Sequence, residues 1–174
     1  MSYRELAETL APKFAKATID LFETEREARG NSSWTVEASS GPCRTDPLRE
    51  WVLYSLAGYI QGCRASTRND EKYLAFARDF ISRCGWYFVD QRVFSTETEF
   101  DELAKDRISD YLTAISNADA DQAMQNVGRA FLTNVGCNPD DIAQRVGAVG
   151  SFMNQSINTK KLFDEIQKTV RLVD

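Results

Sequence analysis

The pattern of apolar and polar positions is helical along most of the chain, and its most apolar stretch covers residues 46–64. From Trp51 to Ile60, Ser55 is the only hydrophilic residue in a run of aromatic and aliphatic ones. A surface helix carries its apolar residues on one face, whereas this segment carries them nearly all round. We therefore predict a buried central helix over residues 47–63, covered by its neighbours.

Four residues of this stretch predict how the central helix begins and how it packs. Asp46 can accept hydrogen bonds from the free amides of the first turn, and Pro47 suits the first helical position. Gly58 and Gly62 lie four apart, so they leave one strip of the helix without side chains. We expect another helix to pack closely against that strip.

Apolar residues at helical spacing also predict a helical region before the central helix. It covers residues 2–29, and Ser2 with Glu5 forms a capping box at its start. Pro12 interrupts the pattern, because proline removes one backbone hydrogen bond and clashes with the preceding turn. We expect two helices or one kinked helix, with the break at Ala11.

After the central helix, five more helical patterns follow. The first of them begins at residue 71 and contains Gly85. It continues to Val93 if Gly85 is a packing contact and does not end the helix. Residues 138–141 are expected to cap the fourth helix, and Asn158 or Thr159 to cap the last. The first three patterns cover residues 71–88, 96–117 and 119–135.

These patterns predict an all-α protein with one domain over residues 1–174. We expect an orthogonal or globin-like bundle of six to eight helices around the buried central helix; 43% hydrophobic residues suffice for such a core. The polar segment 31–45, which contains Trp34, is the longest without helical spacing. Loops of this length are often functional, but a tryptophan in one can also simply cover the core, so both interpretations stay open.

Charge and hydropathy then narrow the class of protein. The formal charge of -5 argues against nucleic-acid binding, which depends on clustered lysine and arginine residues. The chain shows no apolar signal core near its start and no apolar run of roughly 20 residues, the length that spans a bilayer. We expect a soluble, intracellular and cytoplasmic protein without membrane insertion.

The chain contains no histidine, which removes several kinds of chemistry. Ser-His-Asp and Cys-His nucleophiles, histidine-ligated haem and mixed zinc sites all require it. The acidic residues lie mainly in first turns of predicted helices, where capping explains them. The four cysteines have no metal-binding or redox spacing, so we predict no metal site, no catalytic residues and no intrachain disulfide. The four cysteines are Cys43, Cys63, Cys84 and Cys137.

Aromatic residues are dense in the central helix and in the one after it, where they form either a large core or the wall of a ligand pocket. Arg78 and Asp79 place a charged pair beside the apolar face of the second helix. We predict a ligand site at this pair, with Trp34, Tyr73 and Trp86 near enough to contribute, because pockets are mostly apolar with a few polar groups. The alternative for Arg78 and Asp79 is a surface ion pair.

The segment Phe76-Ala77-Arg78-Asp79 resembles the phycobiliprotein family, in which a bilin-bearing cysteine precedes Ala-Arg-Asp. Thr96, the acidic pair at 101–102 and Tyr111-Leu112 extend the similarity. The resemblance implies a globin-like fold and a bilin or other tetrapyrrole, with Arg78 holding a propionate and Asp79 the pyrrole nitrogens. Phe76 replaces the cysteine, so binding would be non-covalent. The polar segment 31–45 departs from the family, which has a long helix there.

These observations favour a non-catalytic helical protein that acts through protein contacts, as an assembly subunit or a regulator. Its partner would be another protein or a second copy of itself. One alternative is a protein that binds a tetrapyrrole or another small ligand. A further alternative is an enzyme that uses carboxylate or cysteine chemistry.

Overall fold

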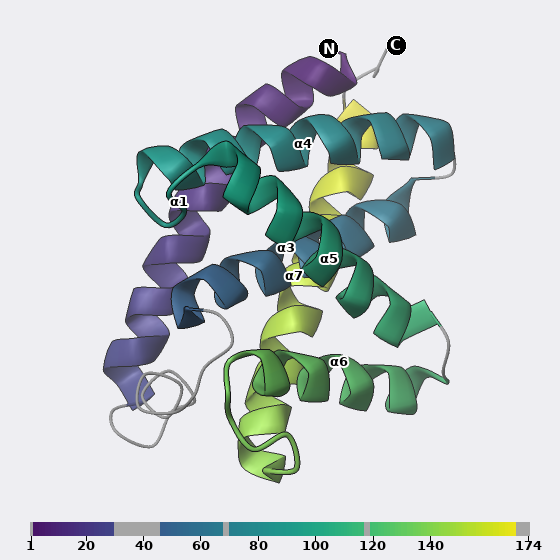
Figure 1. Cartoon of the computed structure of the whole chain (residues 1–174). Coiled ribbons are helices and arrows are strands. Elements are labelled where there is room, and N and C mark those ends of the chain that lie inside the picture. Colours follow the sequence, from purple (N-terminus) through teal and green to yellow (C-terminus); the bar gives the residue numbers. More distant parts are fainter. Residues whose placement is uncertain (1, 30–45, 68–69, 117–118, 170–174) are drawn as a thin grey trace.

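The computed structural model describes residues 2–29, 46–67, 70–116 and 119–169. Within these ranges the chain is all-α, with six helices and no strand (Figure 1). The predicted polar segment 31–45 lies outside the described residues. The helices are α1 (Tyr3–Arg29), α3 (Pro47–Ser66), α4 (Asp70–Asp90), α5 (Glu97–Ser116), α6 (Ala120–Asn134) and α7 (Ile142–Thr169).

The helix α3 lies in the middle of the molecule and packs against α1, α5 and α7 (Figure 1). Its middle is inaccessible to solvent: Leu53 and Leu56 are fully buried, and Ile60 is 3% exposed. Asp46 caps the helix by accepting from the amides of Leu48 and Arg49. The prediction of a buried central helix is confirmed, and so is its start.

The glycine strip of α3 is where α7 packs against it. A Cβ atom at Gly62 would lie 2.7 Å from Cβ of Thr159, and one at Gly58 would lie 3.3 Å from Cβ of Gln155. Neither α7 residue could approach this closely if alanine replaced the glycine. The predicted close helix contact is therefore present, and α7 makes it.

Of the two expectations for the first helical region, a single bent helix is correct. Residues 3–29 form one continuous helix, which bends along its length and has Pro12 in its first half (Figure 1). The predicted start of a separate last helix at Asn158 or Thr159 is wrong, because both lie inside α7. The Thr159 hydroxyl donates to the carbonyl oxygen of Gln155, 2.8 Å away, so the helix itself satisfies this capping residue.

The predicted cap at residues 138–141 is correct only in its last residue. Asp141 caps α7 by accepting from the amide of Gln144 at 3.0 Å. Pro139 does not occupy the first helical position; it lies in a turn in which the Asn138 side chain accepts from the amide of Asp140. Residues 138–141 therefore do not repeat the start of α3, where Asp46 is the cap and Pro47 the first helical residue.

The ends of α4 and α6 share one motif with different residues. After α6, Gly136 adopts a φ of 79°, and the Cys137 amide donates back to Leu132. After α4, Arg92 adopts a φ of 59°, and the Val93 amide donates to Phe88. Both are Schellman turns, which usually carry glycine in the left-handed position. Because α4 uses arginine there, the sequence contained no glycine to mark its end at Asp90.

An arginine connects the start of α3 to the turn between α4 and α5. Arg49 donates to the carbonyl oxygen of Val93 at 2.7 Å and pairs with Glu99. Its guanidinium carbon lies 5.5 Å from the centre of the Phe94 ring. Glu99 also accepts from the Ser95 amide, and this bond, together with Arg49, lowers the pKa of the Glu99 carboxyl.

The first prediction compares two glycines. Gly62→Ala should lower the free energy of unfolding by about 1–3 kcal/mol, because the new methyl group overpacks the α3–α7 contact. Gly150→Ala should raise it by about 0.5–1 kcal/mol, because no atom of the described chain beyond the neighbouring residues and the backbone of the same helix turns would lie within 4 Å of the new Cβ, and alanine favours helix. Urea denaturation measures both. Equal effects of the two substitutions would contradict the close contact.

The second prediction concerns the Glu99 carboxyl. Its folded pKa lies below its ordinary value of 4.5. Its bonds therefore stabilise the fold fully above pH 4.5, and this stability is lost as the pH falls through the folded pKa. Glu99→Gln should lower Tm at neutral pH, and the difference from wild type should shrink in acid. Glu102→Gln, an exposed carboxyl on the same helix, is the control for loss of one charge. A Tm difference that grows in acid would contradict the assignment.

Candidate functional site

An open groove lies between α4 and α5, which diverge from the turn that joins them (Figure 1). Its volume is about 740 Å³. Apolar side chains dominate its surface, and charged ones stand at its edges. It is lined by Leu74, Ala77, Arg78, Ile81 and Ser82 of α4 and by Asp101, Ala104, Lys105, Ile108, Ser109 and Leu112 of α5.

Helical spacing brings these side chains together. On each helix the lining residues recur every three or four positions, which places them on one face. Ala77 and Ala104 are small and buried, so they form a low base between larger neighbours. Leu74 is 61% exposed, which is unusual for a leucine in a compact domain. The groove is thus an apolar depression that the described chain leaves uncovered.

Positively charged side chains outnumber negatively charged ones at the groove. Arg78 extends into solvent, with 82% of its side chain exposed, and Lys105 lies on the opposite helix. Asp101 is the one acidic residue among the residues that line the groove. The rim therefore carries two positive groups and one negative group around an apolar floor.

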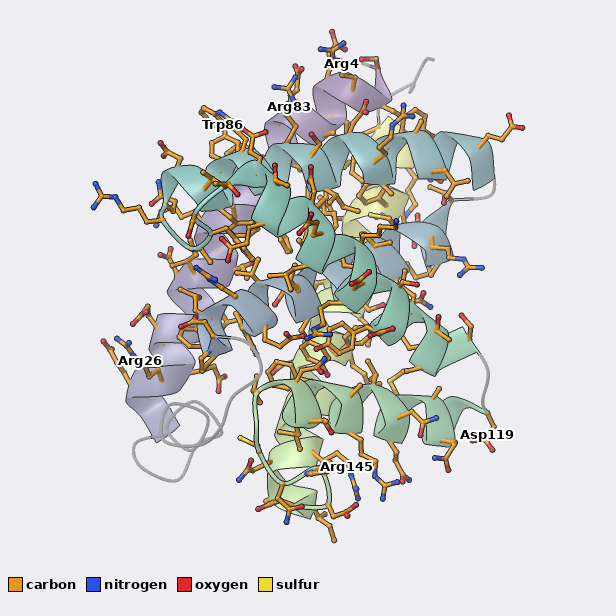
Figure 2. All side chains as sticks on the ribbon, viewed as in Figure 1. Arg4, Arg26, Arg83, Trp86, Asp119 and Arg145 are labelled. Atoms are coloured by element: carbon orange, nitrogen blue, oxygen red, sulfur yellow. The ribbon has the colours of Figure 1, made fainter. Side chains whose placement is uncertain are left out.

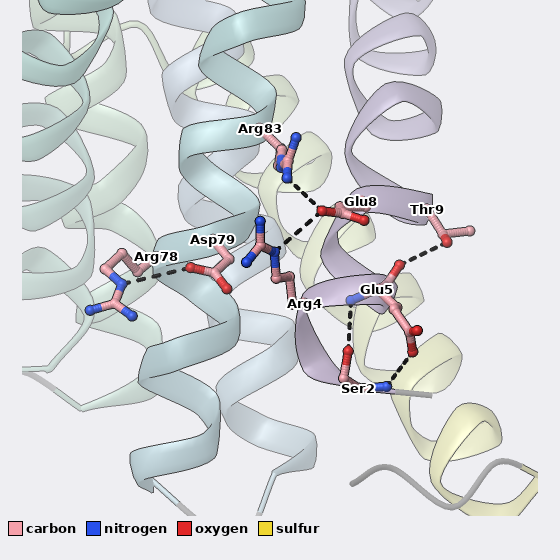
Figure 3. A network of polar contacts seen from close by, with 8 residues as sticks. All are labelled: Ser2, Arg4, Glu5, Glu8, Thr9, Arg78, Asp79 and Arg83. Carbon is pink, nitrogen blue, oxygen red and sulfur yellow. Dashed lines mark hydrogen bonds and ion pairs between the residues drawn. The ribbon is translucent and has the colours of Figure 1, made fainter. Parts of the chain in front are cut away.

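A second, smaller hollow of about 420 Å³ adjoins the groove, and Ser82 lines both. Figure 2 shows Arg4, Arg83 and Trp86 near one another at its outer side. The two arginines pair with the same carboxyl group, Glu8 (Figure 3). Trp86 is 54% exposed and contacts Tyr87 edge to face.

The predicted ligand site is divided between these two depressions. Nε of Arg78 lies 3.7 Å from Oδ1 of Asp79, so the predicted ion pair is present (Figure 3). Arg78 lines the groove, whereas Asp79 lines the hollow together with Trp86. Trp34 and the side chain of Tyr73 lie outside the described residues.

Most of the aromatic residues around Arg78 belong to the core. Phe76 is 1% exposed and stacks on Phe80, and Phe80 stacks on Tyr59 with ring centres 4.4 Å apart. Phe76 also contacts Phe163 of α7 edge to face. Of the two interpretations of this aromatic stretch, core is correct for these residues, and Trp86 is the exposed exception.

The interior contains one polar cluster, centred on Glu50, whose side chain is fully buried. Its carboxyl group accepts from Tyr111 and, at 3.2 Å, from Nε of Arg107. The side-chain amide of Asn134 donates to the same carboxyl at 3.3 Å. Burial and the nearby Glu50 raise the pKa of Tyr111. These partners satisfy the buried carboxyl group, so the cluster connects α3, α5 and α6 inside the core.

The described thiols are unsuited to nucleophilic chemistry. Cys63 and Cys84 are free and buried, and Cys137 is buried as well. Burial raises the pKa of Cys63 and Cys84 well above the ordinary value, which disfavours the reactive thiolate. Cys43 lies outside the described residues. Among the residues that the structure places, no three His, Cys, Asp or Glu side chains are grouped to hold a metal ion.

Sequence reasoning missed the α5 side of the groove. The helical pattern over residues 96–117 places Ile108 and Leu112 on its apolar face, and the structure shows that both also line an open depression. The available signal was the width of the apolar stripe, since α5 also buries Phe100 and Tyr111. A stripe that wide covers more than one neighbouring helix.

No described helix is long and apolar enough to cross a membrane. A scan against protein-family models gave no match, and comparisons with curated proteins and with solved structures gave none either. The function is therefore inferred from the geometry of the molecule.

Proposed function

We propose that this protein is a non-catalytic helical subunit or regulator that binds an apolar segment of a partner protein in the α4–α5 groove. The observation that carries the proposal is the groove itself, which has a volume of about 740 Å³, mostly apolar walls and an opening to solvent. Exposed apolar surface of this kind marks sites of protein contact.

The shape of the groove suits a helix of the partner. A helix that binds in a groove inserts side chains spaced three or four residues apart. Ala77 and Ala104 leave room at the base for such side chains, and Leu74 and Leu112 provide apolar walls. The two positive groups at the rim, Arg78 and Lys105, favour a partner helix with acidic residues beside its apolar ones.

The rest of the molecule agrees with a role in binding. The chain has no histidine, and burial raises the pKa of two of its thiols. Its buried carboxyl group, Glu50, is occupied by Tyr111, Arg107 and Asn134. These features favour protein contact over the enzyme alternative.

A variant in the groove tests the proposal. Leu74→Glu should weaken partner binding about tenfold or more, because the substitution removes a leucine contact and adds a charge to an apolar surface. Leu21→Glu on α1 is the matched control, since Leu21 is also exposed, at 44%, and does not line the groove. Quantitative affinity capture from the native cell compares wild type with the two variants. Proteins retained by wild type and by Leu21→Glu, but lost with Leu74→Glu, support the groove. Equal capture by all three contradicts it.

A second candidate ligand is a tetrapyrrole, favoured by the position of Arg78 at the edge of an apolar depression. Arg78 could pair with a propionate there, as the resemblance to the phycobiliproteins implies. Asp79 lines the neighbouring hollow and Phe76 lies in the core, so this mode relies on Arg78 and the apolar walls. Such a ligand would be held without a covalent bond.

Titration with biliverdin, followed by visible absorption, tests this second candidate. Arg78→Ala should weaken binding about tenfold, because a charge-assisted hydrogen bond to the carboxylate is lost. Arg26→Ala is the control: this exposed arginine lies at the far end of α1 (Figure 2). If wild type does not bind, or if both variants bind equally well, the tetrapyrrole candidate fails while the protein-binding groove is unaffected.

A further inference from the structure

A second apolar surface lies on α7, away from the groove. Five of its large apolar side chains are exposed. Leu162 lies on another side of the helix, whereas the other four, spaced four, seven and four residues apart, lie within about 60° of arc on one side. Their exposed fractions are 69% for Ile142, 65% for Val146, 42% for Met153 and 44% for Ile157. We call these four residues the α7 stripe.

The α7 stripe is symmetric about its own midpoint, which lies between Val149 and Gly150. Ile142 and Ile157 are equally far from that midpoint, and so are Val146 and Met153. If two copies of α7 pack antiparallel, Ile142 of each faces Ile157 of the other, and Val146 faces Met153. A two-fold interface requires this self-complementarity, because the same surface is used on both sides. We propose that two copies of the chain associate through the α7 stripe, antiparallel, about a two-fold axis beside Gly150.

A hollow beside the stripe fits this arrangement. It has a volume of about 480 Å³, and Ile115, Met124, Met153 and Ile157 are among the residues that line it. In the antiparallel pairing, Ile142 of the second copy lies opposite Ile157 and therefore at this hollow. Ile142 is the most exposed large apolar residue of the described chain, so its projecting side chain would meet an apolar depression.

The charges beside the stripe favour the antiparallel direction. Asp140 and Asp141 precede α7; Asp140 pairs with Arg129 and, at 4.0 Å, with Arg145, and its side chain remains 73% exposed. Lys160 and Lys161 lie past the other end of the stripe and are exposed, and Lys160 pairs with Asp164 on its own helix. Antiparallel packing brings the lysines of one copy to the level of the aspartates of the other, whereas parallel packing aligns like charges. Complementary charges of this kind set the orientation of helix pairs.

Gly150 provides space at the proposed axis. Within the described chain, no atom outside its own helix turn and neighbours lies within 4 Å of the position of an added Cβ. Glycine is unfavourable inside a helix, so its presence needs a reason. At Gly62 the reason is the close approach of α7. At Gly150 the approach of a second α7 supplies an equivalent reason. The stripe is only about 24 Å long. It therefore covers less than the roughly 800 Å² per partner of a standard interface, and we expect a dimer that dissociates on dilution.

Concentration-dependent mass tests the dimer. Sedimentation of the full chain from about 1 µM to about 100 µM should show monomer giving way to dimer. Val146→Asp should raise the dissociation constant at least about a hundredfold, because each copy buries the new charge at a two-fold contact. Leu21→Asp is the control and should dimerise like wild type. A monomer at every concentration, or a dimer unaffected by Val146→Asp, overturns the proposal.

Cross-linking tests the direction of packing. Cys43→Ser is the background, since the other three cysteines are buried, and Ile142→Cys and Ile157→Cys are made separately with tags of different size. A short bismaleimide should join the two variants in a mixture but neither to itself, because equivalent residues lie about 22 Å apart along the antiparallel pair. Cross-linking of Ile142→Cys to itself, or a dimer with no cross-link in the mixture, overturns the proposal. Neither experiment involves the groove, so its outcome is independent of the proposed function.

Discussion

The burial of α3 on all sides is the constraint on which the rest of the structure depends. Each of its faces needs a different neighbour, and most of its buried polar groups find partners inside the core. The Tyr59 hydroxyl is an exception, with no hydrogen-bond partner among the described residues. Trp51 donates to the carbonyl oxygen of Thr18 on α1 at 3.1 Å, and Tyr54 donates to that of Ala148 on α7 at 2.9 Å. Glu50 is satisfied from α5 and α6. These bonds and the glycine strip position four helices relative to one, so a change in α3 affects every neighbour.

Features that depend on nearby residues could be predicted from the sequence. The Asp46 cap, the Ser2–Glu5 capping box and the Gly58–Gly62 strip each involve residues a few positions apart, and all are present. The predicted break at Asn158 or Thr159 failed because capping residues are also tolerated inside a helix whose packing holds it straight. The end of α4 at Asp90 lies between the two predicted ends, Phe88 and Val93, and no glycine marks it, because Arg92 takes the left-handed conformation that usually indicates glycine.

The candidate site was predictable only on α4. Arg78 and Trp86 were identified because a charge or a large ring beside an apolar face is visible in one helix. Ala104, Ile108 and Leu112 come from α5, and no local pattern shows which residues of two helices will face each other across an opening. The same limit explains why Asp79 was grouped with Arg78: adjacent residues on a helix point in directions about 100° apart, and the structure assigns them to different depressions.

The two proposed surfaces are compatible because no residue lines both the α4–α5 groove and the hollow beside the α7 stripe. Pairing through α7 would leave the groove open, so a dimer would present two α4–α5 grooves in a fixed two-fold relation. A partner with two suitable helices would then bind the second groove intramolecularly, and its affinity would exceed that for either groove alone. Because the α7 stripe is small, such a partner would also stabilise the dimer, since binding to both copies favours the associated state by mass action. Groove occupancy and association would thereby be thermodynamically linked, although no residue is shared by the two surfaces.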